Sequence, residues 1–464
     1  MFFLDSNSPD PLFKQLYNQM REHILLGTLP ADSKLPSIRD MANNLTVSRN
    51  TVDGAYQELF AEGYIYSRPR SGYFVSPLDQ ESAPRSLISK SDNQRPPLQS
   101  APKYRYDFHP ARLDQASFPT RLWRKFFLEC LRENPQQLSQ YCDSQGELGL
   151  RYSIQSYLER SRGVVCDPDQ IVITAGLQHS IDIVANVLKK DHSSVAVEDP
   201  GYPLASAVLR NHSYNIVPVA VGPDGIDLDA LEVGNSTIVY VTPSHQLPLG
   251  YVMPVANRLR IIEWAEAGKK FILEDDYDSE LRYSGKPIPS LQSLRPDGNI
   301  IYLGTFSKVL SPALRISYLI LPQPLLATYR SLFQNFFSSV SQLEQRTLAK
   351  FMEGGHWDRH IRRMRSIYKK KHDSMLCAVN EHFGSQAEII GQGAGLHIVL
   401  KVLGANVYEK KIIRRAEQKG IYLFPFSWTC ATGESDTTKL MLGFGGLTTS
   451  EIEEGIALLA QGCL

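Results

Sequence analysis

Three reactive side chains follow two apolar runs in the second half of the chain. Lys308 comes soon after the run 300–303, and Asp275 and Tyr277 come after the run 271–273. A lysine amine forms a Schiff base with an aldehyde, a carboxylate keeps a pyridine nitrogen protonated, and a phenol suits a phenolic oxygen. Pyridoxal 5'-phosphate carries all three partner groups, so the pattern predicts a site for this cofactor.

The same region offers groups that bind a phosphate dianion. Thr305, Ser307 and Arg315 stand close to the lysine in sequence, and Gly176 precedes an amphipathic stretch that predicts a helix over 177–190. Small hydroxyls, a bidentate guanidinium and the backbone N–H groups of a helix N-terminus all favour a phosphate. These groups complete the predicted cofactor site.

Each of these residues also has a simpler interpretation. A single lysine after a strand is usually a solvated loop charge, and Asp275 within the acidic run 274–278 could belong to a surface cluster. The whole set in chain order is much harder to obtain by accident. His356 and His360 have the spacing of a helical metal pair, but with no third ligand nearby we predict that they are structural and that no metal is bound.

The elements that must position these groups alternate in type. Amphipathic stretches predict helices over 177–190 and 254–267, and short β-branched runs predict strands. The predicted strands span 171–174, 195–197, 238–241, 271–273, 300–303 and 316–321. This alternation predicts an α/β domain with a mostly parallel sheet, helices on both faces, and ligands at the carboxyl ends of the strands.

The beginning of the chain follows a different pattern. Apolar residues at every fourth position over 12–24 predict a helix, and Ser37 and Ser48 have the context of N-caps of two more helices. Gly63 would be the C-cap of the third helix, and the run 64–75 predicts a hairpin with a basic tip. Three helices and a hairpin predict a winged helix-turn-helix, whose third helix enters the major groove of DNA.

The charges of this block do not make it basic overall, because residues 1–77 contain seven Lys or Arg and eight Asp or Glu. The residues suited to phosphates and base edges nevertheless gather at the helix starts and the hairpin tip. They are Arg39, Ser48, Arg49, Asn50, Thr51, Arg68, Arg70 and Gly72. On charge alone, the alternative is a small helical interaction domain with a solvated charged face.

Residues 78–103 separate this block from the rest of the chain. The stretch is rich in Ser and Pro and lacks apolar periodicity. Such a composition buries too little apolar surface to become ordered, and Pro makes it partly stiff. It predicts a linker between a domain at 1–77 and a larger one at 104–464.

Composition narrows the class of protein. Among 464 residues, 49 Lys and Arg balance 49 Asp and Glu, which excludes a broadly basic nucleic-acid coat. None of the six cysteines forms a CxxC pair, as expected of reduced thiols, and no apolar run is long enough to span a membrane. We therefore expect a multi-domain cytoplasmic protein without a membrane segment.

The first block resembles the GntR-type bacterial regulators. The resemblance rests on Leu35-Pro-Ser-Ile-Arg39-Asp-Met-Ala42, Val47-Ser-Arg-Asn-Thr-Val52 and Gly72-Tyr-Phe-Val75. It implies that Arg39, Ser48, Arg49, Thr51 and the wing 68–72 contact operator DNA.

The second block looks like a fold-type I aminotransferase, the fold of PLP-dependent transferases, with a small C-terminal α/β subdomain at about 345–464. The motifs are Asp199-Pro-Gly-Tyr202, Thr242-Pro-Ser-His-Gln246, Glu274-Asp-Asp-Tyr-Asp-Ser-Glu280 and Gly304-Thr-Phe-Ser-Lys308-Val-Leu-Ser-Pro-Ala-Leu-Arg315. Joined to a GntR-type head, this block resembles the MocR/GabR subfamily of regulators.

The resemblance implies a set of cofactor-binding positions. They are Tyr141, Gly176, Leu177, Tyr202, His245, Gln246, Asp275, Tyr277, Thr305, Ser307, Lys308 and Arg315. Lys308 would form the Schiff base, Tyr202 would stack on the ring, and His245 and Gln246 would lie beside it. Tyr141 would reach the phosphate of the neighbouring subunit, which implies a head-to-tail, domain-swapped homodimer.

Two arginines that hold a ligand carboxylate in GABA-sensing relatives are absent here. The positions that match them are Leu204 and Gly446, and the arginine that aminotransferases carry near the C-terminus is missing too. An unpaired carboxylate loses charge-assisted bonds worth about 1.5–3 kcal/mol each. GABA and ordinary α-amino acids are therefore poor candidate ligands, with Lys439 and Arg112 left as possible substitutes for the missing clamp.

These features predict a transcriptional regulator whose aminotransferase-like domain senses pyridoxal phosphate and has weak or no turnover. The missing clamp fits relatives of the PdxR kind, in which the cofactor itself is the effector and vitamin B6 synthesis genes are the target. An amine that reacts with the cofactor is a second candidate effector. The alternatives are a working aminotransferase with a DNA-binding head, and a DNA-binding scaffold with an empty pocket.

Overall fold

The computed structural model describes residues 2–5, 8, 10–69, 71–77, 104–133, 135–283, 288–404, 409–431 and 438–463. The chain divides into two compact units, Met1–Ser100 and Ala101–Leu464. The division falls inside the stretch 78–103, the predicted linker, which lies outside the described residues. Within the described residues, no helix is both long and apolar enough to cross a membrane.

The first unit is a winged helix-turn-helix, as predicted. Its elements are α1 (Leu12–Leu25), α2 (Ile38–Leu45), α3 (Arg49–Ala61), β1 (Ile65–Arg68) and β2 (Gly72–Val75). Ser37 and Ser48 cap α2 and α3, because their hydroxyls accept from the backbone N–H groups of Asp40 and Thr51 at 3.1 and 3.2 Å. The C-cap of the third helix lies one residue earlier than predicted: it is Glu62, and Gly63 follows it with a φ of +77°.

One apolar cluster holds the three helices and the wing together. Leu16, Met20, Val52, Tyr56 and Leu59 are each fully buried in it. β1 and β2 pair antiparallel, with Ile65 opposite Val75 and Arg68 opposite Gly72. The positions that carried the helical periodicity are therefore the core of this unit.

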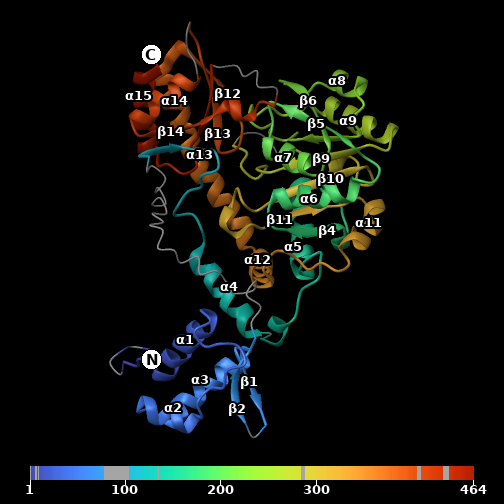
Figure 1. Cartoon of the computed structure of the whole chain (residues 1–464). Coiled ribbons are helices and arrows are strands. Elements are labelled where there is room, and N and C mark those ends of the chain that lie inside the picture. The colour runs from blue at the N-terminus through green and yellow to red at the C-terminus, as the bar shows by residue number, and fades with distance from the viewer. Residues whose placement is uncertain are drawn as a thin grey trace. The chain divides into compact units, whose positions relative to one another are not determined.

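The second unit contains an eight-stranded sheet in the order β4-β11-β10-β9-β8-β5-β6-β7 (Figure 1). Its strands are β4 (Ile171–Thr174), β5 (Ser194–Asp199), β6 (Asn215–Gly222), β7 (Gly225–Ile226), β8 (Ile238–Val241), β9 (Phe271–Asp276), β10 (Ile300–Thr305) and β11 (Ser317–Ile320). The five strands from β10 to β6 are mutually parallel. β11 runs antiparallel to β10 because a short loop, and not a crossover helix, joins the two.

Helices cover both faces of this sheet, as the alternation predicted. They are α5 (Leu148–Arg162), α6 (Leu177–Leu188), α7 (Pro203–Asn211), α8 (Leu228–Val233), α9 (Val255–Ala267), α10 (Leu291–Leu294), α11 (Gln323–Phe333) and α12 (Gln342–Glu353), and α4 (Thr120–Glu133) packs against α12. On β8, Ile238 and Tyr240 pack with α6, α7 and α11, whereas Val239 and Val241 pack with α8 and α9. Each face thus buries alternate residues of the same strand.

A smaller α/β subdomain follows, with a five-stranded sheet in the order β12-β13-β15-β14-β3. Its elements are β3 (Tyr106–Phe108), α13 (His356–Phe383), β12 (Ala387–Ile390), β13 (His397–Val402), α14 (Glu409–Gln418), β14 (Ile421–Pro425), β15 (Lys439–Gly443) and α15 (Thr449–Cys463). The subdomain is not purely C-terminal, because β3 pairs in parallel with β14. Nothing local in 106–108 identifies a partner more than three hundred residues away.

Candidate cofactor site and DNA-binding surface

The carboxyl ends of the parallel strands open into a cavity of about 370 Å³ in the second unit. Eight of the twelve sequence-predicted cofactor positions line it: Leu177, Tyr202, Asp275, Tyr277, Thr305, Ser307, Lys308 and Arg315. Asp275 lies within β9 and Thr305 ends β10, so both strands extend further than their apolar runs predicted. Parallel strands end at one edge of the sheet, which is why these separated segments converge.

Lys308 lies inside this cavity and not on a solvated loop. Its ammonium is 5.8 Å from the ring centroid of Tyr277. Burial lowers the pKa of Lys308, while the negative charges of Asp278 and Asp275 act in the opposite direction. The amine is thereby shifted toward its unprotonated form, which is the form that attacks an aldehyde.

Asp275 has one oxygen that is satisfied and one that is not. Its Oδ2 accepts a hydrogen bond from the Tyr240 hydroxyl, and its Oδ1 is buried with no partner among the described residues. Asp275 is only 3% exposed. The alternative that it belongs to an acidic cluster on the surface is therefore wrong. A buried carboxylate oxygen without a donor fits the N–H of a pyridinium.

The region beside Gly176 has the properties of an anion seat. Gly176 caps α6 with a φ of +90°, and a Cβ at this position would lie 2.2 Å from Nη2 of Arg315. Arg315 Nη2 donates to the carbonyl of Ala175 at 3.2 Å, and no described carboxylate forms an ion pair with it. The N-terminus of α6 and this guanidinium therefore face the same space, and a glycine keeps that space open.

Hydroxyl groups at the end of β10 add to the anion site formed by the α6 N-terminus and Arg315. Thr305 Oγ1 accepts from the Ser317 hydroxyl at 2.8 Å and from the backbone N–H of Ser307 at 3.1 Å. The loop that carries Lys308 is thus tied to the end of the strand. Together with the α6 terminus and Arg315, these groups fit the phosphate of the predicted cofactor.

His245 and Gln246, predicted beside the ring, lie behind the cavity wall. His245 Nδ1 is 3.0 Å from the Tyr277 hydroxyl and 2.9 Å from Asp278 Oδ2. Gln246 Nε2 donates to the carbonyls of Pro200 and Leu247 at 2.8 and 2.6 Å. His245 can therefore orient Tyr277, whereas Gln246 holds the surrounding loops.

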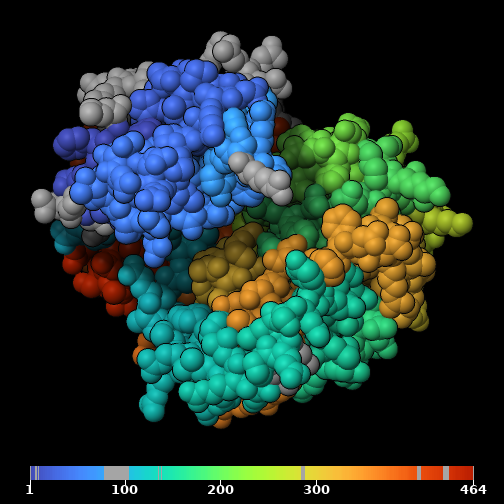
Figure 2. Space-filling view, turned by 60° about the horizontal axis from the view of Figure 1, so that its bottom comes forward, coloured from blue at the N-terminus to red at the C-terminus, as the bar shows by residue number. Residues whose placement is uncertain are grey.

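Tyr141 lies outside the cavity. Its side chain is 80% exposed, and its ring stacks on Phe337 with centroids 4.2 Å apart and planes 14° apart. The teal surface of the second unit in Figure 2 belongs to the part of the chain that runs from α4 to α5. The role predicted for Tyr141 at a neighbouring subunit's phosphate thus requires a second copy of the chain.

Sequence reasoning missed the residues that close the other side of the cavity. They are His109, Pro110, Ala111, Leu247, His397, Phe424, Trp428, Thr429 and Met441, together with Gln178 and Thr242. Most follow β3 or belong to β13–β15, so they reach the cavity only through the pairing of the small sheet. None of these segments was predicted as a strand, and none carries a motif that indicates cofactor chemistry.

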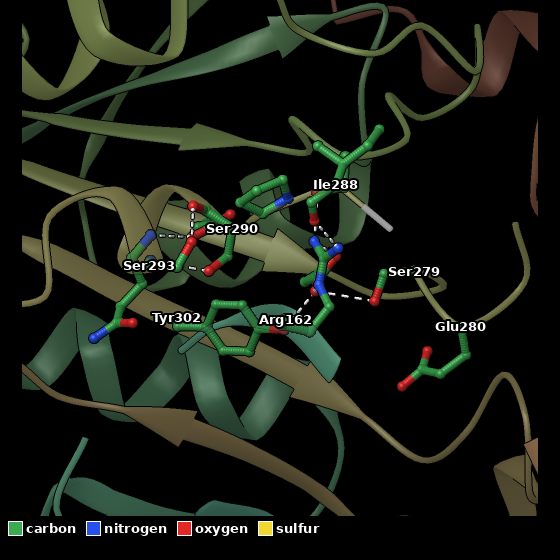
Figure 3. Close-up of polar contacts among 12 residues, drawn as sticks. Arg162, Ser279, Glu280, Ile288, Ser290, Ser293 and Tyr302 are labelled. Carbon is green, nitrogen blue, oxygen red and sulfur yellow. Dashed lines mark hydrogen bonds and ion pairs between the residues drawn. The ribbon is translucent and has the colours of Figure 1, made fainter. Parts of the chain in front are cut away.

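A buried ion pair beneath the site was also missed. Arg162 donates to both carboxylate oxygens of Asp276, at 2.7 and 3.0 Å, and to the Ser244 hydroxyl at 2.7 Å. Figure 3 shows its guanidinium directed toward the backbone of Ile288, while Tyr302, whose hydroxyl binds Asp276, lies alongside. This network fixes the end of β9 just beyond Asp275.

The pKa of Asp275 leads to a pH-dependent prediction. Burial raises it to about 7, against about 4 in an unfolded chain. Between these values the folded protein holds a proton that the unfolded chain has lost, so raising the pH removes stability. The quantity to compare is the free energy of unfolding of the cofactor-free protein minus that of Asp275→Asn. We expect this difference to fall by roughly 2 kcal/mol between about pH 5 and about pH 8.

Denaturant unfolding of both proteins across this range measures that difference. The comparison isolates Asp275, because the buried histidines with lowered pKa, such as His397, are common to both proteins. A difference that does not change with pH would show that Asp275 is ionised throughout.

Five of the eight predicted DNA-contacting residues lie at the N-terminal ends of α2 and α3: Arg39, Ser48, Arg49, Asn50 and Thr51. Arg39 and Arg49 are exposed there, as is Asn50, and neither arginine forms an ion pair with a described carboxylate. Ser48 Oγ lies 2.8 Å from Thr51 Oγ1. Two helix N-termini with unpaired cations form a surface suited to phosphates.

The wing presents its arginine differently. Arg68 lies 4.5 Å from the ring centroid of Phe74, and it contacts the Tyr66 hydroxyl at 2.6 Å and Asp32 at 3.7 Å. Gly72 adopts a φ of +101° where the turn re-enters β2. Arg70, also predicted to contact DNA, lies outside the described residues.

The described residues hold no cluster of three or more potential metal ligands. His360 Nε2 lies 2.9 Å from the carbonyl of Val309, and His356 stacks on Phe351. Both histidines of the helical pair thus have structural contacts.

A winged helix-turn-helix joined to an aminotransferase fold defines a class of DNA-binding regulators built on an enzyme scaffold. The profile of "Bacterial regulatory proteins, gntR family" matches residues 12–75, and that of "Aminotransferase class I and II" matches residues 112–459. Among solved structures, LysN of Thermus thermophilus, an α-aminoadipate aminotransferase complexed with N-(5'-phosphopyridoxyl)-L-leucine, is 26% identical with a TM-score of 0.69. The match covers 77% of this chain and 91% of that chain.

Three relatives share both parts. The "Uncharacterized HTH-type transcriptional regulator YdeL" of Bacillus subtilis is 40% identical over 98% of this chain and 98% of its own. The probable rhizopine catabolism regulatory protein MocR of Rhizobium meliloti is 33% identical over 100% and 96%, respectively. The pyridoxine biosynthesis regulator PdxR of Corynebacterium glutamicum is 32% identical over 86% and 84%. The chain belongs to the MocR/GabR subfamily of GntR-type transcriptional regulators.

Proposed function

We propose that this regulator binds pyridoxal phosphate in the second unit and that the bound cofactor changes its affinity for operator DNA. The observation that carries the proposal is the unpartnered Oδ1 of buried Asp275, in the same cavity as Lys308 and the anion seat. A carboxylate, an amine of lowered pKa and a phosphate seat match the three functional groups of this cofactor.

Each group would have a separate task. Pyridoxal phosphate supplies an aldehyde that reacts with primary amines. Lys308 provides the amine, Asp275 holds the ring nitrogen proton at Oδ1, and Tyr277 donates to the phenolic oxygen while His245 fixes its orientation. Arg315 and the N-terminus of α6 hold the phosphate, with Gly176 leaving the room for it.

A homodimer would complete the site. Tyr141 and Phe337 form an exposed stacked pair, and neither lines the cavity of its own chain. In a head-to-tail dimer, Tyr141 would reach the phosphate bound by the partner subunit. Operator DNA of a bacterium lies in the cytoplasm, and we place the protein there with it.

The effector that fits best is the cofactor itself. Leu204 lines the cavity where GABA-sensing relatives carry an arginine, and Arg112 is occupied by Asp107 at 2.8 Å. A carboxylate ligand would thus find no clamp among the described residues. PdxR, which shares both parts of this chain, is named for pyridoxine biosynthesis, and vitamin B6 synthesis genes are our proposed target.

The test is DNA binding as a function of cofactor concentration. Duplexes selected from random sequence by the full-length protein supply the DNA. We expect saturating pyridoxal phosphate to change the affinity about tenfold, within the usual range of allosteric coupling. Pyridoxine 5'-phosphate, which has the same ring and phosphate but no aldehyde, should have a much smaller effect. Identical DNA affinity at every cofactor concentration would contradict the proposal.

A working aminotransferase is the second candidate, because the groups that fit the cofactor are all present in the cavity. Purified protein incubated with an amino donor and a keto acceptor distinguishes the two. Sustained multiple turnover would establish the enzyme. Cofactor uptake without product would support the sensor.

A further inference from the structure

The cavity has two chemically different halves. Except for Leu177, the residues that fit the cofactor are polar or charged, and they come from the strand ends of the large sheet and the segments that follow them. The opposite half includes His109, Leu204, Leu247, His397, Phe424 and Trp428, and its other lining residues are uncharged. Apart from the two histidines, none of these side chains carries an ionisable group.

The two histidines do not supply a positive charge. Burial lowers the pKa of His397 to about 4, and its Nε2 lies 2.9 Å from the carbonyl of Pro248. Burial also lowers the pKa of His109, whose Nδ1 accepts from the backbone N–H of Ala111 at 3.0 Å. Both imidazoles are therefore neutral at pH 7, and His109 carries its proton on Nε2.

The two cations that could replace the missing clamp are held elsewhere. Arg112 Nε donates to Asp107 Oδ2 at 2.8 Å. Arg112 also packs against Gly446, one of the two positions of the missing arginines, because a Cβ at Gly446 would lie 2.6 Å from Arg112 Cβ. Lys439 has its ammonium 5.3 Å from the ring centroid of Phe426. Neither Arg112 nor Lys439 lines the cavity.

We propose that the small ligand accepted beside Lys308 is a hydrophobic primary amine without a carboxylate, such as an arylalkylamine. This inference rests on the proposed cofactor function. The ligand's amine would replace that of Lys308 on the cofactor carbon: one C–N bond forms as the other breaks, and Lys308 leaves as a free amine. No oxidant or reductant is needed. The apolar tail would lie against Leu204, Phe424 and Trp428.

The proposed dimer would add to the same preference. Phe337 stacks on Tyr141, so a Tyr141 placed at the partner's site brings a second aromatic ring with it. The exposed fraction of Phe337 is 57%, which leaves a face available for contact. The two aromatic rings from the partner subunit would then enlarge the apolar half of the cavity and add no charge to it.

The sharpest probe is a pair of ligands that differ only in the carboxylate. Cofactor-loaded full-length protein is titrated with 2-phenylethylamine and with phenylalanine, and binding is followed by calorimetry and by the absorbance of the cofactor. We expect 2-phenylethylamine to bind at least about tenfold more tightly, since an unpaired carboxylate forfeits one or more charge-assisted bonds.

Leu204→Arg places a cation in the apolar half and should reverse the preference. Ala207→Arg is the matched control, because it adds the same charge to an exposed position of α7 that does not line the cavity. It should leave the preference for 2-phenylethylamine as it is.

Equal or tighter binding of phenylalanine by the unsubstituted protein would overturn this inference and leave the cofactor function standing. Binding of phenylalanine that disappears in Arg112→Met would overturn it in a specific way, by identifying the clamp. Protein that takes up no pyridoxal phosphate would overturn both proposals, and uptake measured before any amine is added separates the two failures.

Discussion

Lys308→Ala should lose the pyridoxal phosphate that the unsubstituted protein retains through dialysis. The substitution removes the amine of the cavity, while Asp275, Arg315 and the α6 terminus would still hold the ring and phosphate by noncovalent contacts in the proposed site. We expect the apparent affinity to fall by about a hundredfold or more, equivalent to roughly 3 kcal/mol. Absorbance of the dialysed protein and equilibrium titration with the cofactor measure the loss.

Lys190→Ala is the matched control for this experiment. Lys190 is exposed just beyond α6 and does not line the cavity. Its substitution therefore removes one lysine side chain, as Lys308→Ala does, but leaves the cavity residues unchanged. DNA binding of Lys308→Ala should also become insensitive to pyridoxal phosphate. A variant that keeps the cofactor as tightly as the unsubstituted protein would show that Lys308 is not its attachment point.

Arg49→Ala should weaken DNA binding by about tenfold or more and make it less sensitive to salt. Arg49 is the first residue of α3, is exposed, and has no ion pair with a described carboxylate. A cation there is free to neutralise a phosphate at the end of a helix whose dipole also favours negative charge. The slope of log affinity against log salt concentration should fall by about 1.

Lys14→Ala provides the comparison for Arg49. Lys14 is an exposed cation of the same unit, on α1 and outside the α2–α3 pair. We expect its removal to have a much smaller effect on affinity and slope. Equal effects of the two substitutions would mean that DNA contacts the unit through its general charge and not through α3.

Features that depend on neighbours in sequence were predictable. Ser37 and Ser48 cap their helices because each hydroxyl reaches an N–H three residues ahead, and the hairpin follows from two aromatic runs around a tight tip. The six predicted strands of the large sheet are all present. β6 and β7 were missed because β6 lies near the sheet edge, carries Pro218 and is only partly buried, so its pattern is weak.

Features that depend on distant pairing were not predictable. The donor to Asp275 is Tyr240, from the neighbouring strand β8, and the partner of Asp276 is Arg162, at the end of α5. His245 and Gln246 were expected beside the ring because the resemblance implied those positions. The structure places both behind the cavity wall, because the loop that carries them turns toward Pro200 and Asp278.

The order of residues along the chain alone determined the two-part organisation, the family, and a lysine, carboxylate and phosphate seat for one cofactor. Those signals are local: a motif needs only its own strand, turn and helix to be recognised. Tertiary structure alone decided three features of the site: Asp275 has an oxygen with no partner among the described residues, Arg112 is engaged by Asp107, and the half of the cavity opposite the cofactor-fitting groups is uncharged and largely apolar. Charge and burial at a site are sums over groups brought together from the whole fold, and no short window of sequence contains them.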